Sequence, residues 1–238
     1  MTSSFRDPSV PWMLRVHSAT GIAPLSAFFA LHLWINARAT QGRRAYETWA
    51  YAIHAIPGRA VFEALFIELP LAFHAVYGVL VVLDRVPGYP EPPHVHPWSR
   101  SMERVTGIAA LLFIGFHVMA LRVPLLLGEL VTADLHPKLA AELSTTNALG
   151  VPLAAVAYLL GLAASAYHLA NGVSRFCLRA GLGETERARR VLSLSCTLLG
   201  SVSFFIGANT VVYFATGAPL VDTNPPATTG AAIAEKRV

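Results

Sequence analysis

The sequence predicts an all-α integral membrane protein, a bundle of five transmembrane helices. The first observation is composition: of 238 residues, 54% are hydrophobic and only 13% are charged, which is about half the charged share of a typical soluble domain. The second is that long stretches lack Arg, Lys, Asp and Glu and approach or exceed the roughly 20 residues that cross a bilayer. The third is that Pro and Gly clusters separate these stretches. Together these features argue against an ordinary soluble enzyme.

The five helices are expected at residues 16–37, 61–83, 105–127, 148–174 and 191–214. The first apolar run is longer than that of a secretory signal peptide, so it is expected to remain as a helix. The membrane domain then covers residues 1–221. A polar tail rich in small residues, 222–238, is expected to be disordered. The intervals are expected to be loops and leave no room for a large extramembrane domain.

Charge near the helix ends favours an N-terminus in the cytoplasm, because cytoplasmic loops carry an excess of Lys and Arg. The inner set is Arg6, Arg15, Arg85, Arg100, Arg104, Arg175, Arg179, Arg187, Arg189 and Arg190, and the outer set is Arg38, Arg43, Arg44, Arg59 and Lys138.

The sequence has no basic domain that would indicate nucleic-acid binding. The two cysteines, Cys177 and Cys196, lack the spacing of a thiol-held metal site or of covalent haem attachment.

Four histidines fall inside the predicted helices, one in each of the first four: His32, His74, His117 and His168. An ionisable group in the hydrocarbon is costly and usually functional, although any single one could be a neutral ring bonded to a nearby carbonyl. At 1.5 Å per residue, His74 and His168 lie about 12 and about 9 Å from the cytoplasmic ends of their helices, and the other two lie roughly 18–22 Å from that face. The histidines therefore form two layers. Two imidazoles on different helices are what is needed to clamp one haem iron.

Residues around the histidines fit this hypothesis. Arg122 and Arg175 are candidate partners for haem propionates, with snorkelling to the membrane interface as the alternative. Gly78 and Gly172 each follow a proposed ligand by four residues and would let a flat macrocycle approach. Pro24 and Pro70 are expected to distort the first two helices.

The other histidines carry less signal. His17 is expected at the interface, with a contact to a quinone or a propionate as the alternative. His94 and His96 are expected in a solvated loop, with a metal site as the alternative. His54 and His136 are expected in outer loops.

The chain resembles the cytochrome b membrane-anchor subunits of succinate dehydrogenase and fumarate reductase, of the kind with five helices and two haems. The stretches that carry the resemblance are 15–21, 32–33, 69–78, 104–107, 116–118 and 167–172. The resemblance implies a distal haem b on His32 and His117 and a proximal haem b on His74 and His168. It also implies a bacterial cytoplasmic membrane location and a role linked to the tricarboxylic acid cycle.

The partners implied by the resemblance are a flavoprotein carrying FAD and an iron–sulfur subunit docked on the cytoplasmic face. Electrons would pass from the iron–sulfur clusters through both haems to menaquinone or another quinone. The chain would do no carbon chemistry itself. Whether the complex oxidises succinate or reduces fumarate is set by the partners.

A quinone takes up two protons when it is reduced, so a nearby carboxylate is an attractive relay. Glu63 and Glu68 are the acidic residues inside a predicted span, and Glu47 in the first outer loop is a further candidate. The alternative is that Glu63 pairs with Arg59 four residues earlier and that Glu68 makes a helix–helix hydrogen bond.

Two other functions compete. One is the cytochrome b subunit of another membrane-bound quinone-linked dehydrogenase, which the distribution of one histidine per helix argues against. The other is a haem-free transporter that uses the histidines as a proton relay.

Overall fold

The computed structural model describes residues 12–86 and 95–222, and all regular elements within these ranges are helical. Five helical spans are long and apolar enough to cross a membrane: Trp12–Gln41, Arg59–Val82, Pro97–Leu127, Leu153–Arg179 and Glu186–Thr216. The predicted all-α class with five transmembrane helices is therefore confirmed. The expected disordered tail lies almost entirely outside the described residues.

Three of the five spans are divided into more than one helix. The elements along the chain are α1 (Trp12–Thr20), α2 (Ser26–Ala37), α3 (Arg43–His54), α4 (Arg59–Glu63), α5 (Leu69–Val82), α6 (Pro97–His117), α7 (Val123–Leu127), α8 (Leu135–Ser144), α9 (Leu153–Arg179) and α10 (Glu186–Thr216). The fourth span begins at Leu153 and not near residue 148. The Asn147 side chain accepts hydrogen bonds from the backbone N–H groups of Leu149 and Val151, which holds this segment in a turn.

A π-helical turn interrupts each of the first three spans, and each turn is associated with a proline. The turns are Gly21–Leu25, Ala64–Glu68 and Val118–Arg122. Pro24 lies inside the first, and a proline follows each of the others by two residues. A proline cannot donate a backbone hydrogen bond, and the wider turn adapts the helix to that loss. The distortion expected of Pro24 and Pro70 therefore takes the form of π turns.

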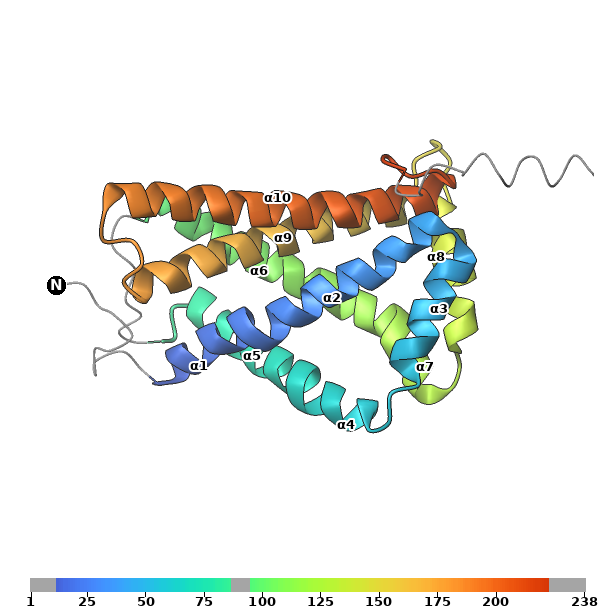
Figure 1. Cartoon of the computed structure of the whole chain (residues 1–238), viewed down its shortest axis with the longest axis horizontal. Helices are drawn as coiled ribbons and strands as arrows, with labels where there is room; N and C mark the ends of the chain where they lie inside the picture. The colour runs from blue at the N-terminus through green and yellow to red at the C-terminus, as the bar shows by residue number, and fades with distance from the viewer. Residues whose placement is uncertain (1–11, 87–94, 223–238) are drawn as a thin grey trace, which may run out of the picture.

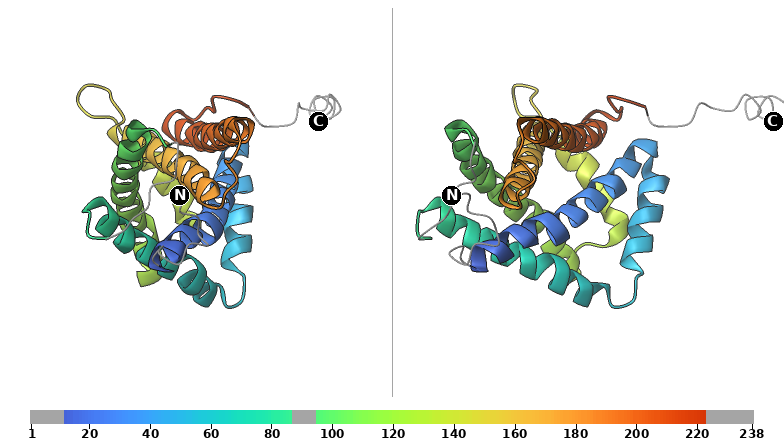
Figure 2. Two further views of the ribbon diagram at one scale, coloured as in Figure 1. Left: turned by 90° about the vertical axis from the view of Figure 1, so that its left-hand side faces the viewer. Right: turned by 60° about the vertical axis from the view of Figure 1, so that its left-hand side comes forward.

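The spans run side by side between two ends of the molecule (Figure 1). At the α1 end, α1, α6 and α10 begin and α5 and α9 finish; at the α8 end lie α3 and α8. The view onto the α1 end shows the helices arranged around the bundle axis (Figure 2). Helix α9 packs against both α6 and α10, α10 also contacts α2, and α5 contacts α1 and α6. The π turn Gly21–Leu25 of the first span also contacts α5 and α9, so the spans that carry the predicted histidines are neighbours, and α10 packs beside α9 and α2.

The largest buried core lies at the α8 end, where two segments expected as loops are helical. Helix α8 buries Leu135, Leu139 and Leu143, which are spaced four residues apart on one face, and α3 buries Tyr46 and Ala50 in the same way. These faces pack with the adjoining ends of α9 and α10. The apolar i, i+4 spacing was the signal in the sequence that could have predicted both helices.

Large apolar side chains cover the outside of the spans. Leu112, Val76, Leu160, Leu198 and Phe205 are each more than 60% exposed. A soluble monomer rarely exposes so much contiguous apolar surface. These faces therefore fit contact with lipid chains.

The α6–α9 interface depends on a glycine. A Cβ built on Gly161 of α9 would lie 2.1 Å from Cγ of Phe113 on α6. We expect Gly161→Ala to lower the stability of the bundle by about 1–3 kcal/mol through overpacking, measured as thermal unfolding in detergent. The matched control is Gly115→Ala on α6, where a Cβ would meet nothing within 4 Å. Equal stabilities for the two variants would contradict this description of the interface.

Candidate functional site

Two of the predicted histidines meet near the α1 end. The ring centroids of His74 on α5 and His168 on α9 lie 6.2 Å apart, with an angle of 85° between the ring planes. Nδ1 of His74 is 3.0 Å from the backbone carbonyl oxygen of His17, and Nδ1 of His168 is 3.2 Å from that of Glu103. A carbonyl oxygen only accepts, so both bonds place the proton on Nδ1. Nε2 of each ring is then left with a lone pair.

The other two predicted histidines meet nearer the α8 end. The ring centroids of His32 on α2 and His117 at the end of α6 lie 5.7 Å apart, with an angle of 88° between the ring planes. Nδ1 of His117 is 3.3 Å from the hydroxyl of Tyr158 on α9. Phe113 and Phe28 lie against the two rings. The structure therefore brings together the same two pairs that helix depth predicted.

The spacing of both pairs fits a single metal ion held between them. If each imidazole nitrogen lies about 2 Å from a shared ion, the two ring centroids are about 6 Å apart. Within residues 12–86 and 95–222, no group of three or more His, Cys, Asp and Glu side chains is arranged to hold a metal. A haem needs only two ligands from the protein, because the macrocycle supplies the others. The donor set therefore fits a haem better than a metal ion bound by protein alone.

Two glycines leave the space that the rings of His74 and His168 occupy, because a side chain at either position would overlap a ring. A Cβ on Gly21 would lie 2.7 Å from Cε1 of His74, and a Cβ on Gly107 would lie 2.9 Å from Cε1 of His168. Gly78 and Gly172, which were expected to let a macrocycle approach, lie against other side chains. Gly78 faces His17 and Gly172 faces Glu103. Both Gly21 and Gly107 belong to the motifs listed above, but their contacts depend on how the helices are rotated.

His17 contacts one of the paired histidines, which was not expected. Its ring stacks on that of His74, with centroids 4.1 Å apart and planes 9° apart, and it also contacts Tyr77. The His17 Nε2 atom is buried and has no hydrogen-bond partner among the described residues. The spacing of His17 and Gly21, one helical turn apart, was the signal that could have placed both against His74.

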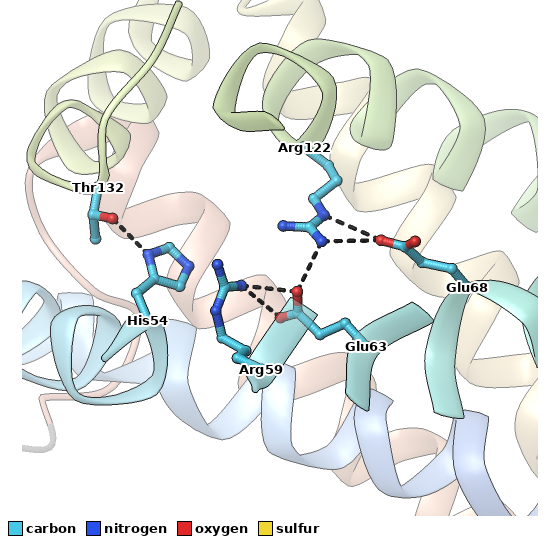
Figure 3. Close-up of polar contacts among 6 residues, drawn as sticks. All are labelled: His54, Arg59, Glu63, Glu68, Arg122 and Thr132. Carbon is cyan, nitrogen blue, oxygen red and sulfur yellow. Dashed lines mark hydrogen bonds and ion pairs between the residues drawn. The ribbon is translucent and has the colours of Figure 1, made fainter. Parts of the chain in front are cut away.

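A cluster of charged side chains joins the second and third spans, as Figure 3 shows. Nη2 of Arg122 is 2.8 Å from a carboxylate oxygen of Glu63 and 3.0 Å from one of Glu68. Arg59 also pairs with Glu63, at 2.7 Å, so that i, i+4 prediction is confirmed. Glu68 and Arg122 are the last residues of their π turns. Arg122 is thus engaged by two carboxylates, and this arrangement competes with its predicted role toward a propionate.

His54 extends the polar region beyond the spans. It ends α3, and its Nδ1 is 2.5 Å from the hydroxyl of Thr132. Burial lowers the pKa of His54, Arg59 and Arg122 lower it further, and Glu63 partly offsets them. The folded state therefore favours the neutral ring at this position.

The remaining candidates lie apart from this cluster. Arg175 on α9 is only 5% exposed, and it lines a cavity of about 410 Å³ together with Arg189 and Arg190.

Glu47, the third candidate carboxylate, pairs with Arg43 at 2.6 Å. His96 caps α6 by accepting a hydrogen bond from the Trp98 backbone N–H, and His94 lies outside the described residues.

Comparisons with known proteins point to one family. The family model of succinate dehydrogenase/fumarate reductase transmembrane subunits matches residues 91–208. The chain is 28% identical over 200 residues to the succinate dehydrogenase cytochrome b558 subunit of Bacillus subtilis, covering 84% of this chain and 95% of that protein. The chain is therefore similar to the transmembrane subunits of succinate dehydrogenase and fumarate reductase. No solved structure matches it.

The family match and this relative confirm the resemblance found in the sequence. The matched region contains α6, α9 and most of α10, and with them His117 and His168. With five apolar spans, the chain is a multi-pass membrane subunit. Sequence reasoning missed the contacts of His17, Glu103 and Tyr158 with the paired histidines.

Proposed function

We propose that this chain is the dihaem cytochrome b membrane anchor of a succinate:quinone oxidoreductase. The observation that carries the proposal is the meeting of four intramembrane histidines as two pairs with ring centroids 6.2 and 5.7 Å apart. The similarity to succinate dehydrogenase transmembrane subunits supports the same function, since a cytochrome b subunit of succinate dehydrogenase implies haem b and association with flavoprotein and iron–sulfur subunits.

In this proposal His74 and His168 hold the proximal haem, and His32 and His117 hold the distal one. A haem with two axial histidines carries single electrons and leaves no open position on its iron. The protein's part is orientation. Hydrogen bonds at Nδ1 of His74 and His168 fix each ring and leave on Nε2 the lone pair that would bind the haem iron. Arg175 is the proposed propionate partner at the α1 end, because it is a buried cation one to two turns after His168.

The carboxylate cluster is the proposed proton relay for quinone reduction. Glu63 lies between two arginines, with Arg59 at 2.7 Å and Arg122 at 2.8 Å from its carboxylate. The Glu68 side chain is 49% exposed and bonds to Arg122 alone among the ion pairs of the described residues. It is therefore the carboxylate of this cluster best placed to exchange a proton with a bound quinone.

The α1 end is the proposed docking face for the flavoprotein and iron–sulfur partners. It carries most of the arginines near the helix ends, which places it in the cytoplasm by the excess of positive charge. The N-terminus is then cytoplasmic, in a bacterial inner membrane. Electrons would enter at the His74–His168 pair, and menaquinone or another quinone would be reduced nearer the α8 end.

We expect His74→Ala to remove one of two haems, because each haem depends on one pair. The measurement is the dithionite-reduced minus oxidised spectrum of the purified protein. The control is His136→Ala on α8, which should retain both. Full haem occupancy in His74→Ala would contradict the pairing. A wild-type spectrum without a b-type α-band would favour the haem-free transporter instead.

We expect Glu68→Gln to lower succinate:quinone turnover of the assembled complex by about 10²-fold or more, the usual size of a lost general acid or base, with haem content unchanged. The control is Glu142→Gln on α8, whose carboxylate pairs with Lys138. Unchanged quinone turnover in Glu68→Gln would remove Glu68 from the proposed relay.

A further inference from the structure

A chain of polar contacts ties α6 to α9 beside the His168 ring. Nδ1 of His168 is 3.2 Å from the Glu103 carbonyl oxygen and 3.4 Å from carboxylate oxygen Oε1 of the same residue. The second carboxylate oxygen, Oε2, accepts a hydrogen bond of 2.6 Å from the side-chain amide of Asn171. One residue therefore presents both a backbone and a side-chain acceptor to the same imidazole nitrogen.

Asn171 is itself held on both sides of its amide group. Its Nδ2 also donates to the backbone carbonyl of Ser99 at 3.2 Å, and its Oδ1 accepts from the Ser99 hydroxyl at 2.8 Å. Ser99 and Glu103 lie one turn apart on α6, and His168 and Asn171 lie nearly one turn apart on α9, so the four side chains share one interface. The Glu103 side chain is 19% exposed. The carboxylate is thus fixed in place and partly shielded from water.

Glu103 distinguishes His168 from the other paired histidines. His74 bonds through Nδ1 to a backbone carbonyl, and His117 lies near a phenol hydroxyl. Among the ion pairs of the described residues, His168 is the one of the four intramembrane histidines that has a carboxylate partner. The negative charge of a carboxylate beside Nδ1–H favours positive charge on the imidazole, and this makes the opposite nitrogen a stronger electron donor to a metal.

We propose that Glu103 is a positioning residue that fixes the His168 ring and, through its carboxylate, stabilises the oxidised form of the proximal haem relative to the reduced form. This inference rests on the proposed function. Nδ1–H bonding and the charge beside an axial ligand are among the means by which a protein sets a haem potential. Because the carboxylate serves one pair, its removal should change one haem and leave the other as it was.

The test is a potentiometric titration of the purified haem-loaded protein, followed by its visible spectrum. Glu103→Gln keeps the shape and removes the charge, and Glu103→Asp keeps the charge. We expect Glu103→Gln to favour reduction of one haem by about tenfold, which is about 59 mV for a one-electron couple. Glu103→Asp should recover part of that change. The His74→Ala protein, which keeps the distal haem alone, identifies which midpoint belongs to which pair.

The matched control is Asp84→Asn. Asp84 pairs with Arg104, next to Glu103, but its side chain is 74% exposed. That variant removes one negative charge near the same end without touching a histidine, so neither midpoint should move appreciably.

Two titration results would overturn the inference: unchanged midpoints in Glu103→Gln, or equal shifts of both haems. Loss of the proximal haem alone would support it, because the fold that holds the other haem has survived. If both haems were lost from Glu103→Gln, the inference would also be contradicted, because the carboxylate would then be needed by the whole bundle and not by one haem. Fewer than two haems in the wild-type protein would instead contradict the proposed function.

Discussion

The cost of placing an imidazole inside a membrane governs this structure. A ring nitrogen without a partner is expensive in hydrocarbon, and three of the four rings have a protein oxygen near Nδ1: a backbone carbonyl for His74 and for His168, and a phenol hydroxyl for His117. Each of these oxygens comes from a different helix than the ring it contacts. Correct placement of one ring therefore depends on the rotation and depth of at least two helices. The Nδ1 hydrogen bonds of His74 and His168 also leave the lone pair on Nε2, so the bond that makes burial of the ring tolerable leaves the opposite nitrogen free of a proton.

The π turns connect this constraint to the helices. An additional residue within a turn changes the direction in which all later side chains of that helix point, and such turns are frequent at functional sites. The first turn begins at Gly21, which packs on His74, and the third begins directly after His117. The hydroxyl of Ser26 donates to the carbonyl oxygen of Gly21 at 2.6 Å, which compensates for part of the disturbed backbone bonding. The prolines, the π turns and the paired histidines therefore lie close together and depend on one another.

The sequence was sufficient to predict the number of spans and the way the histidines pair, because both follow from length and from position along a helix. It was not sufficient for contacts that depend on helix rotation. His17 stacks on His74, and Glu103 contacts His168, although each lies in or beside a motif that had been noticed. Arg122 bonds to Glu63 and Glu68 for the same reason: it ends a π turn, and that turn determines where its side chain points. Helices α3 and α8 escaped prediction because their apolar faces are short and lie within polar segments.

The central claim is that the four histidines hold two haems, and the most direct measurement is the ratio of haem b to polypeptide in the purified wild-type protein, obtained from the pyridine haemochrome spectrum and amino-acid analysis. With two bis-histidine sites per chain, the account predicts a ratio of about two. A ratio of one would mean that one pair serves only to join helices. A ratio of zero, in protein that remains folded and bound to its partners, would contradict the account.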